Sequence, residues 1–450
     1  MAQTRPAIFQ PARYSAFRLL GHSYEPKSAT VSLSYALDDE LDFEELIQLP
    51  AGAPEPAGER AQALDRVLSL LHLVAGVSYY KAAAPPRIEL PCELGPATAS
   101  LLNAVYKLGL GEFAYENRLD GPVKVSFPVS PKAPSAPVRL EDSGGSLVPI
   151  GGGKDSIVAL ELARSVSEVT LFAVGERAPI LRTAEVADLP LLIARRTISP
   201  LLLQLNGAGA LNGHVPVTAI VSLIALASAI LHGHERVVMA NERSASQGNL
   251  QWGGIEVNHQ WSKSAEFEDL LRAAVSQEIV EGVDYFSLLR PVGELAIAKA
   301  FACMPAYHRA FLSCNSGFRL SGASEDWCCD CPKCRFVFLA LAPFMTPEQL
   351  RGIFGADLLD QESQVPGFMA LCGYRADKPF ECVGEHEESL AALRLLADSS
   401  AWREHAVIRH ARATVLSSAP TDVGQARRLL EVNGPHHVPE AYLEALRARL

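Results

Sequence analysis

The stretch VPIGGGKDSIVALELA, residues 148–163, sets the expected fold. Its first three residues are apolar, and apolar residues recur at roughly helical spacing from Ile157, so the glycines between them stand at a strand-to-helix junction. A helix that begins there presents unpaired N–H groups and a partial positive charge. Glycines let a phosphate approach the backbone, and Lys154 adds a point charge. The stretch predicts a phosphate-binding turn; the alternative is a plain turn in which Asp155 and Ser156 cap the helix.

Comparison of the loop with known phosphate-binding motifs indicates which phosphate-containing ligand to expect. The loop has neither the P-loop spacing Gly-x-x-x-x-Gly-Lys-Ser/Thr nor the dinucleotide pattern Gly-x-Gly-x-x-Gly. It resembles the loop Ser-Gly-Gly-x-Asp-Ser of the ATP pyrophosphatases, which split ATP into AMP and pyrophosphate, with Gly151 in place of the first Ser. This resemblance implies that the ATP phosphates and Mg²⁺ are held by Gly151, Gly152, Gly153, Lys154, Asp155 and Ser156.

Strand-like and helix-like segments alternate from residue 147, which predicts an α/β fold with a doubly wound, mostly parallel sheet. The resemblance of the loop implies that this sheet is of the ATP-pyrophosphatase type. Ligands in such sheets bind beyond the carboxyl ends of the strands, so residues 151–156 and 241–246 are expected on the same rim. The expected organisation is an N-terminal α+β domain (1–130), a linker (131–146), an ATP-binding domain (147–300), a Cys-rich segment (301–345) and a mostly helical C-terminal region (346–450).

Composition excludes several classes of partner. The 450 residues are 48% hydrophobic and carry a net charge of −11, which fits an ordered globular protein and argues against unspecific binding to nucleic acid or anionic membranes. The N-terminus has no apolar signal region, so a cytoplasmic protein is expected. The apolar run 215–233 is interrupted by Pro216 and flanked by histidines, which favours a buried helix over a membrane span.

Nine cysteines are present, and four of them lie within residues 328–334. Thiolates at Cys-x₂-Cys spacing with a remote fourth Cys suit a structural zinc ion, which predicts the ligands Cys314, Cys328, Cys331 and Cys334. Cys329 is the odd member and is expected outside the ligand set. Buried or redox thiols and an iron–sulfur cluster are alternatives, and Cys314 is also a candidate for moving a proton.

Polar residues gather in three further segments. His214 precedes the apolar helix, and Glu242 follows a buried strand in the segment Asn241–Ser244. Arg243 suits a carboxylate or phosphate, while Glu242 suits magnesium or proton transfer. A third segment, EVNHQWSK, contains His259 and Lys263. Substrate contact and ordinary packing are both open for Lys81, Glu112, Tyr115, Arg290 and Glu294.

Taken together, these segments resemble the family of UDP-N-acetyl-α-D-muramoyl-L-alanyl-L-glutamate epimerases. The matching stretches are LHLVAGVSYYKAAAPP, LGEFAYENRL, IGGGKDS, NGHVPVTA, NERSAS, EVNHQWSK, YFSLLRP, WCCDCPKCRFVFLALAPFM and KPFECVGE. These stretches run from about residue 66 to 385. Their combination is specific for this family, whereas no single stretch would be. The resemblance implies a small-molecule substrate, UDP-MurNAc-L-Ala-L-Glu, whose terminal L-glutamate becomes D-glutamate for peptidoglycan synthesis. ATP and magnesium would be consumed, with release of AMP and pyrophosphate.

The implied chemistry fits the loop, because adenylation of a carboxylate removes its charge and makes the α-proton easier to take. The expected proton carriers are two of His214, Glu242, His259 and Cys314. The expected substrate contacts are Arg243, Asn241, Ser244 and Lys263. Two rivals stand beside the epimerase: an ATP-dependent ligase or nucleobase-modifying enzyme, and a nucleotide-binding scaffold with a degenerate site. The sequence leaves the oligomeric state open.

Overall fold

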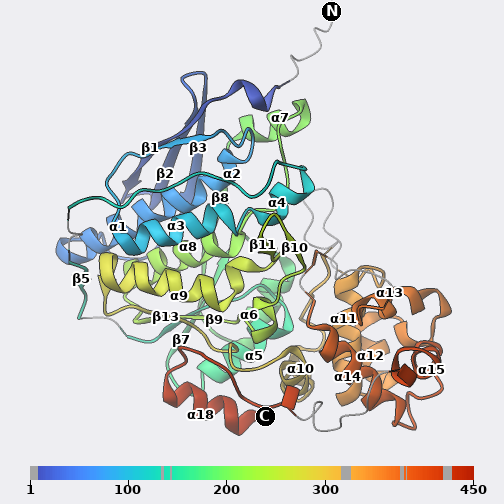
Figure 1. Ribbon diagram of the computed structural model, residues 1–450. Helices are drawn as coiled ribbons and strands as arrows, with labels where there is room; N and C mark the ends of the chain where they lie inside the picture. The colour runs from blue at the N-terminus through green and yellow to red at the C-terminus, as the bar shows by residue number, and fades with distance from the viewer. Residues whose placement is uncertain are drawn as a thin grey trace, which may run out of the picture. The chain divides into compact units, whose positions relative to one another are not determined.

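A computed structural model describes residues 9–132, 136–141, 144–315, 326–374, 380–381, 383–418 and 428–450 (Figure 1). The chain divides into two compact units, of which unit 1 comprises residues 1–147, 192–237 and 251–285, and unit 2 comprises residues 148–191, 238–250 and 286–450. The domain limits expected from the sequence stay a prediction, and part of the expected linker lies outside the described residues.

The main sheet of unit 1 is largely antiparallel. Its strands stand in the order β8 (Leu191–Thr197), β3 (Leu41–Gln48), β2 (Thr30–Leu37), β1 (Ala16–Glu25) and β4 (Arg87–Glu89). Neighbours from β8 to β1 pair antiparallel, and β4 runs parallel to β1. Side chains alternate between the faces of a strand, so Phe43, Glu45 and Ile47 of β3 are buried. The buried Glu45 is neutralised by Arg196 of β8, whose guanidinium bonds both carboxylate oxygens at 2.7 and 3.0 Å.

Helices cover this sheet and build the rest of unit 1. They are α1 (Gly58–Ala75), α2 (Val77–Tyr80), α3 (Pro96–Lys107), α4 (Gly111–Glu116), α7 (Pro200–Ala208), α8 (Val217–His232) and α9 (Ala265–Ala274). Two short strand pairs accompany them, β10 (Leu250–Trp252) with β11 (Ile255–Val257) and β5 (Val138–Arg139) with β12 (Val280–Glu281). Helix α8 packs against α1 and is buried from Ala219 to Leu231 with one partly exposed residue. The buried helix expected from the apolar run is thereby confirmed. In the described part of the chain, none of the helices combines the length and apolarity that a bilayer span requires.

The strands of unit 2 include a parallel pair. These strands are β13 (Asp284–Ser287), β9 (Arg236–Met239), β6 (Ser146–Pro149) and β7 (Val169–Val174), in that order, and the first residues of β6, β9 and β13 belong to unit 1. β6 and β9 pair in parallel. Helices α5 (Lys154–Ala163), α6 (Ala178–Ala187) and α10 (Glu294–Ala302) follow β6, β7 and β13 along the chain. The α/β class and the parallel sheet are confirmed, while the ATP-pyrophosphatase type of the fold stays a prediction.

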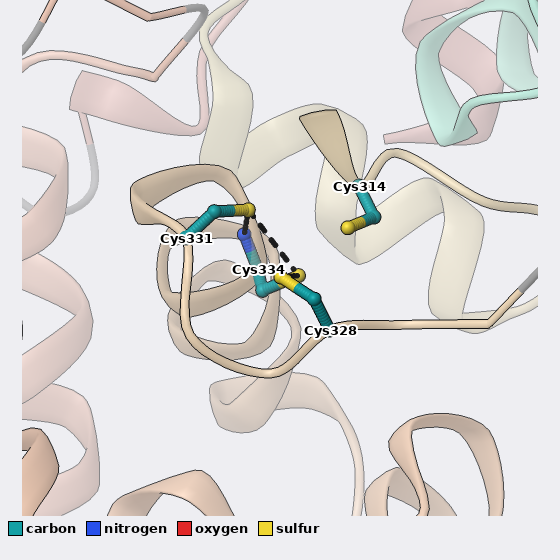
Figure 2. Close-up of side chains that lie close together, drawn as sticks. All are labelled: Cys314, Cys328, Cys331 and Cys334. Carbon is teal, nitrogen blue, oxygen red and sulfur yellow. Dashed lines mark hydrogen bonds between the residues drawn. The ribbon is translucent and has the colours of Figure 1, made fainter. Parts of the chain in front are cut away.

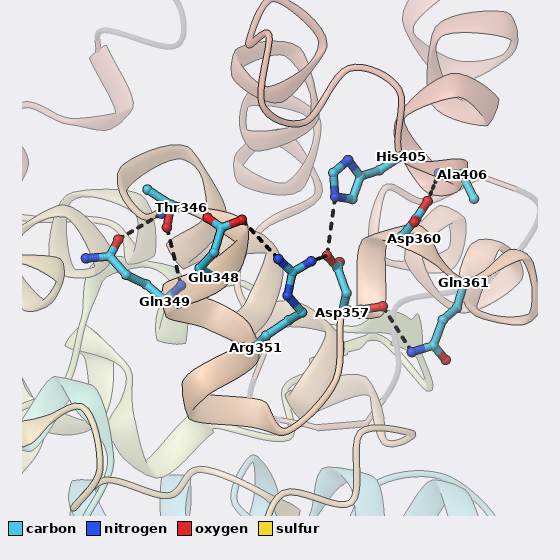
Figure 3. A network of polar contacts seen from close by, with 9 residues as sticks. All are labelled: Thr346, Glu348, Gln349, Arg351, Asp357, Asp360, Gln361, His405 and Ala406. Atoms are coloured by element: carbon cyan, nitrogen blue, oxygen red, sulfur yellow. Dashed lines mark hydrogen bonds and ion pairs between the residues drawn. The ribbon is translucent and has the colours of Figure 1, made fainter.

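The rest of unit 2 is helical, as the sequence predicts. It contains α11 (Pro332–Leu341), α12 (Pro347–Phe354), α13 (Val365–Leu371), α14 (His386–Ala397), α15 (Ala406–Ala413), α16 (Val415–Ser418) and α18 (Glu440–Arg449). Asp357 links two of these helices, because it accepts hydrogen bonds from Arg351 of α12 and from His405, the N-cap of α15, both at 3.3 Å (Figure 3). The backbone N–H of Ala406 adds a bond to Asp360 at 3.3 Å. These polar contacts fix the helices around an apolar core.

Candidate active site

The loop between β6 and α5 has the form of a phosphate cradle. Gly152 has φ +78°, and a Cβ there would lie 2.6 Å from Cβ of Pro179, so only glycine fits. Gly153 is the N-cap of α5, and among the described residues its helix start has no side-chain cap. The hydroxyl of Ser156 donates to the carbonyl of Gly153 at 3.0 Å. A Cβ on Gly151 would meet nothing within 4 Å, so the departure from Ser at this position has no steric cause.

The amine of Lys154 forms ion pairs with two carboxylates in this structure. Its side chain is 1% exposed, and its Nζ contacts Asp155 and Glu294 of α10. Burial works against the charged amine, yet the two carboxylates raise the pKa of Lys154 above its ordinary value. Burial raises the pKa of Glu294, while Lys154 acts in the opposite direction. The contact of Lys154 with phosphate stays a prediction. The structure shows that the positive charge of Lys154 is already balanced by these two carboxylates.

Polar side chains line the carboxyl ends of β9 and β13. The amide of Asn241 donates to the hydroxyl of Ser287 at 3.0 Å, and Arg290 donates to the carbonyl of Glu242 at 2.8 Å. Arg243 donates to Oδ1 of Asn433 at 2.5 Å. The buried hydroxyl of Ser244 has no hydrogen-bond partner among the described residues. Asn241, Glu242 and Ser244 are buried, so any ligand they contact must enter the protein rather than lie on its surface.

Glu388 of α14 is a member of this region that the sequence did not suggest. It is 1% exposed, and its carboxylate oxygens accept from the N–H groups of Leu295 at 3.3 Å and Glu385 at 3.1 Å. Burial, followed by the charge of Glu294, raises the pKa of Glu388 to about 8. No local pattern marks this residue, because the contact with Leu295 spans 93 positions of the chain.

The four cysteines predicted as zinc ligands come together at the start of α11 (Figure 2). Their sulfur atoms all lie within 4.8 Å of one another, with Cys334 at 3.7 Å from Cys328 and at 3.5 Å from Cys331. Cys329 is not in this group, and its Sγ donates to the carbonyl of Phe354 at 3.3 Å. The segment 316–325, which joins Cys314 to the other three cysteines, and Cys382 lie outside the described residues.

The sulfur positions fit a tetrahedral zinc ion. A Zn–S distance of about 2.3 Å places the sulfur atoms of a regular tetrahedron about 3.8 Å apart. The two measured separations, 3.7 and 3.5 Å, are close to that edge. Cys314 is fully buried within the group, which suits a structural ligand better than a group that exchanges protons with solvent.

A second cluster lies in unit 1, where His259 and His214 face each other. Nδ1 of His259 is 2.6 Å from Oε2 of Glu112 on α4, and the ring centroids of the two histidines are 4.4 Å apart. One donor atom from each of these three side chains lies within 4.8 Å of the other two. Burial, followed by the neighbouring His259, lowers the pKa of His214 to about 4. The imidazole of His214 is therefore neutral at pH 7.

Lys263, which is predicted as a substrate contact in the segment EVNHQWSK, is also close to the histidines. Its charge contributes to the lowered pKa of His214, and its Nζ is 3.4 Å from Oε1 of Gln260. The structure thus brings His214, His259 and Lys263 together in unit 1. It places the loop 151–156, the segment Asn241–Ser244 and the cysteines in unit 2.

Comparisons with known proteins give the chain its class. A family model described as the MurL N-terminal domain matches residues 8–288, and one described as the MurL C-terminal domain matches residues 310–426. A protein of Micromonospora sp. named UDP-N-acetyl-alpha-D-muramoyl-L-alanyl-L-glutamate epimerase is 48% identical, with 97% of this chain and 99% of that protein covered. A protein of Xanthomonas oryzae pv. oryzae with the same name is 42% identical, with 98% of this chain and 99% of that protein covered. No solved structure matches.

An α/β fold with buried acid–base groups, similar over nearly its whole length to named epimerases, is an enzyme of the isomerase class. The chain belongs to the MurL family, since the two family models together span most of its residues.

Proposed function

We propose that this enzyme converts the terminal L-glutamate of UDP-MurNAc-L-Ala-L-Glu to D-glutamate, through an acyl-adenylate made from ATP. The substrate rests on the names of the relatives, which match almost the entire chain. The adenylation step rests on the loop before α5, where Gly152 cannot be replaced without a clash and the helix N-terminus has no side-chain cap among the described residues.

Each unit carries one part of this chemistry. In unit 2, the loop 151–156 would hold the phosphates, and nearby carboxylates such as Asp155, whose side chain is 24% exposed, would supply oxygen ligands to Mg²⁺. When bound, Mg²⁺-ATP supplies the adenylyl group that activates the substrate carboxylate. Arg243, Asn241 and Ser244 bind the substrate, since they lie at the carboxyl ends of the strands, where α/β sheets bind ligands.

In unit 1, His214 and His259 carry the acid–base chemistry. Adenylation removes the carboxylate charge, so a neutral imidazole can take the α-proton. Glu112 orients His259 through Nδ1, and His259 in turn lies against the ring of His214, which remains neutral at pH 7. The positive charge of Lys263 acts on His214 and suits the developing oxyanion. Cys314 is better assigned to zinc, and the fourth predicted carrier, Glu242, lies in unit 2, where its charge acts on the buried Glu294.

The zinc ion is proposed as structural. Cys314, Cys328, Cys331 and Cys334 fill all four positions of a tetrahedral site, so such an ion would have no open position for substrate. When bound, it would fix the start of α11 and the chain around Cys314.

The test is a reaction in deuterated water with UDP-MurNAc-L-Ala-L-Glu, ATP and Mg²⁺. The expected products are AMP, pyrophosphate and D-glutamate that carries deuterium at Cα after hydrolysis. Two variants separate the steps: Ser156→Ala should slow AMP release, whereas His214→Ala should still release AMP and leave the glutamate in the L form. D-glutamate formed without AMP would overturn the adenylate route.

The rival enzyme is an ATP-dependent ligase. It would also release AMP and pyrophosphate, but its product would gain the mass of an added amine, and the glutamate would keep its L configuration. A scaffold with a degenerate site would release no pyrophosphate. Mass spectrometry of the product mixture therefore distinguishes all three.

A further inference from the structure

Lys81 is a buried lysine that the proposed mechanism leaves unused. It follows α2 directly, and the residue is 6% exposed. Its Nζ donates to Oδ1 of Asn212, and within the described part of the chain it forms no ion pair with a carboxylate. Burying an amine without a counter-ion is costly, so such lysines are rare outside functional sites. Burial lowers the pKa of Lys81 to about 8, which leaves both of its protonation states accessible near neutral pH.

The loop before α8 ties Lys81 to the histidine cluster. The N–H of Leu211 donates to the carbonyl of Ala82 at 3.0 Å, so this loop is pinned beside the end of α2. On its other side, Asn117 at the end of α4 donates to the carbonyl of Asn212 at 2.9 Å. His214 follows two residues after Asn212, and the Cα atoms of these two residues are at most about 7.6 Å apart. The amine of Lys81 and the imidazole of His214 therefore border the same short loop.

Inversion at one carbon sets a geometric requirement on the proton carriers. A proton carrier on each face of the carbon, each about 3–3.5 Å from it, places the two carriers about 6–7 Å apart. One donor atom from each of His214, His259 and Glu112 lies within 4.8 Å of the others, and the centroids of the two imidazole rings are 4.4 Å apart. We assign this closely packed histidine pair to one face of the substrate carbon, and the carrier for the other face then comes from another side chain.

We propose that Lys81 is this second proton carrier and faces the glutamate Cα from the side opposite to His214. This inference rests on the proposed function. In the L-to-D direction the neutral imidazole of His214 accepts the α-proton, and the C–H electron pair moves into the enolate of the acyl-adenylate. The ammonium of Lys81 then donates a proton to the other face, which forms the new C–H bond and leaves a neutral amine. Proton exchange with solvent then returns His214 to the neutral imidazole and Lys81 to the ammonium form.

Proton exchange without inversion is the signature that tests this assignment. The variant Lys81→Met keeps the apolar stem of the side chain and removes the amine. It is incubated with UDP-MurNAc-L-Ala-L-Glu, ATP and Mg²⁺ in deuterated water. We expect D-glutamate to fall by roughly 100-fold or more, the range that a positioned acid or base contributes. AMP release should continue, and the recovered L-glutamate should carry deuterium, because His214 still removes the α-proton and returns a deuteron to the same face.

Lys81→Arg is the second variant, because it retains a buried cation and covers the case in which Lys81→Met fails to fold. A guanidinium stays protonated and regenerates poorly as a base, so this variant should also lose multiple turnover to D-glutamate. Lys132→Met is the matched control, since the side chain of Lys132 is 78% exposed and pairs with Glu93 at the surface.

Either of two results would overturn the role of Lys81: D-glutamate formed at the wild-type rate by the Lys81 variants, or L-glutamate recovered without deuterium while AMP is released. Failure of the proposed function itself looks different, since the wild-type enzyme would then form no D-glutamate.

Discussion

The replacement Glu388→Gln should make the stability of this protein less dependent on pH. Glu388 is 1% exposed, and burial raises its pKa from an ordinary 4.5 to about 8. Below pH 4.5 the carboxyl group is protonated in both the folded and the unfolded chain, so its contribution to stability is complete. As the pH rises toward 8, the unfolded chain releases the proton and the folded protein keeps it. The folded state therefore loses stability with rising pH, until its own carboxyl group ionises.

The magnitude follows from the size of the shift. A difference of about 3.5 pKa units at about 1.36 kcal/mol per unit corresponds to about 5 kcal/mol lost between pH 4 and pH 8. Glutamine has the shape of the protonated acid and cannot ionise, so the variant escapes this loss. The amide nitrogen of glutamine cannot accept the N–H bond that a carboxyl oxygen accepts, which gives the variant a loss that is the same at every pH. On top of this constant difference, we expect Glu388→Gln to gain a few kcal/mol in free energy of unfolding relative to the wild-type protein between pH 4.5 and pH 8.

The assay is urea unfolding at several pH values, with the wild-type and variant proteins compared at each pH so that the titration of other groups cancels. Glu387→Gln is the matched control, because Glu387 is the exposed neighbour on the same helix. A constant difference between Glu388→Gln and wild type across the pH range would refute the reasoning, since it would mean that Glu388 ionises normally in the folded protein.

Four further predictions concern the other sites. Gly152→Ala should destabilise the protein by about 1–3 kcal/mol and abolish AMP release, because of the positive φ and the contact with Pro179, whereas Gly151→Ala should leave thermal unfolding unchanged. Cys328→Ser should lower the zinc content, measured by plasma mass spectrometry, from one ion per chain toward zero. The imidazole of His214 should titrate in NMR spectra with a pKa about 4, and a normal pKa would contradict its burial. Calorimetry should detect tight ATP binding only when Mg²⁺ is present.

Local sequence patterns predicted the elements whose signal is local. The apolar spacing in 217–232 predicted a buried helix, and the step from apolar residues to glycines at 150–153 predicted the junction before α5. The first strand, Ala16–Glu25, was missed because its burial alternates only in its first half and a bulge between Leu19 and Gly21 shifts the pairing. A bulge breaks the two-residue period on which a strand prediction depends.

These local patterns could not predict which distant side chains contact the predicted site residues. Glu294 contacts Lys154 across 140 positions, and Glu112 contacts His259 across 147 positions. Periodicity reports which face of an element is buried, and it carries no information about which distant element covers that face. Residue type alone left Glu112 and Lys81 undecided between substrate contact and packing. Burial and hydrogen-bond partners, which only the fold supplies, make them candidates for acid–base chemistry.

The charge balance of the loop explains why magnesium is expected with ATP. Lys154 brings one positive charge to the loop, and Asp155 and Glu294 bring two negative charges, so the three side chains together are negative. The triphosphate of ATP is itself strongly anionic, and backbone N–H groups at the start of α5 contribute only about half a positive charge. Repulsion between these anions requires a further cation. A divalent ion would meet this need, and the partly exposed Asp155 would supply an oxygen ligand, which is the reason that we tie ATP binding to Mg²⁺ rather than to Lys154.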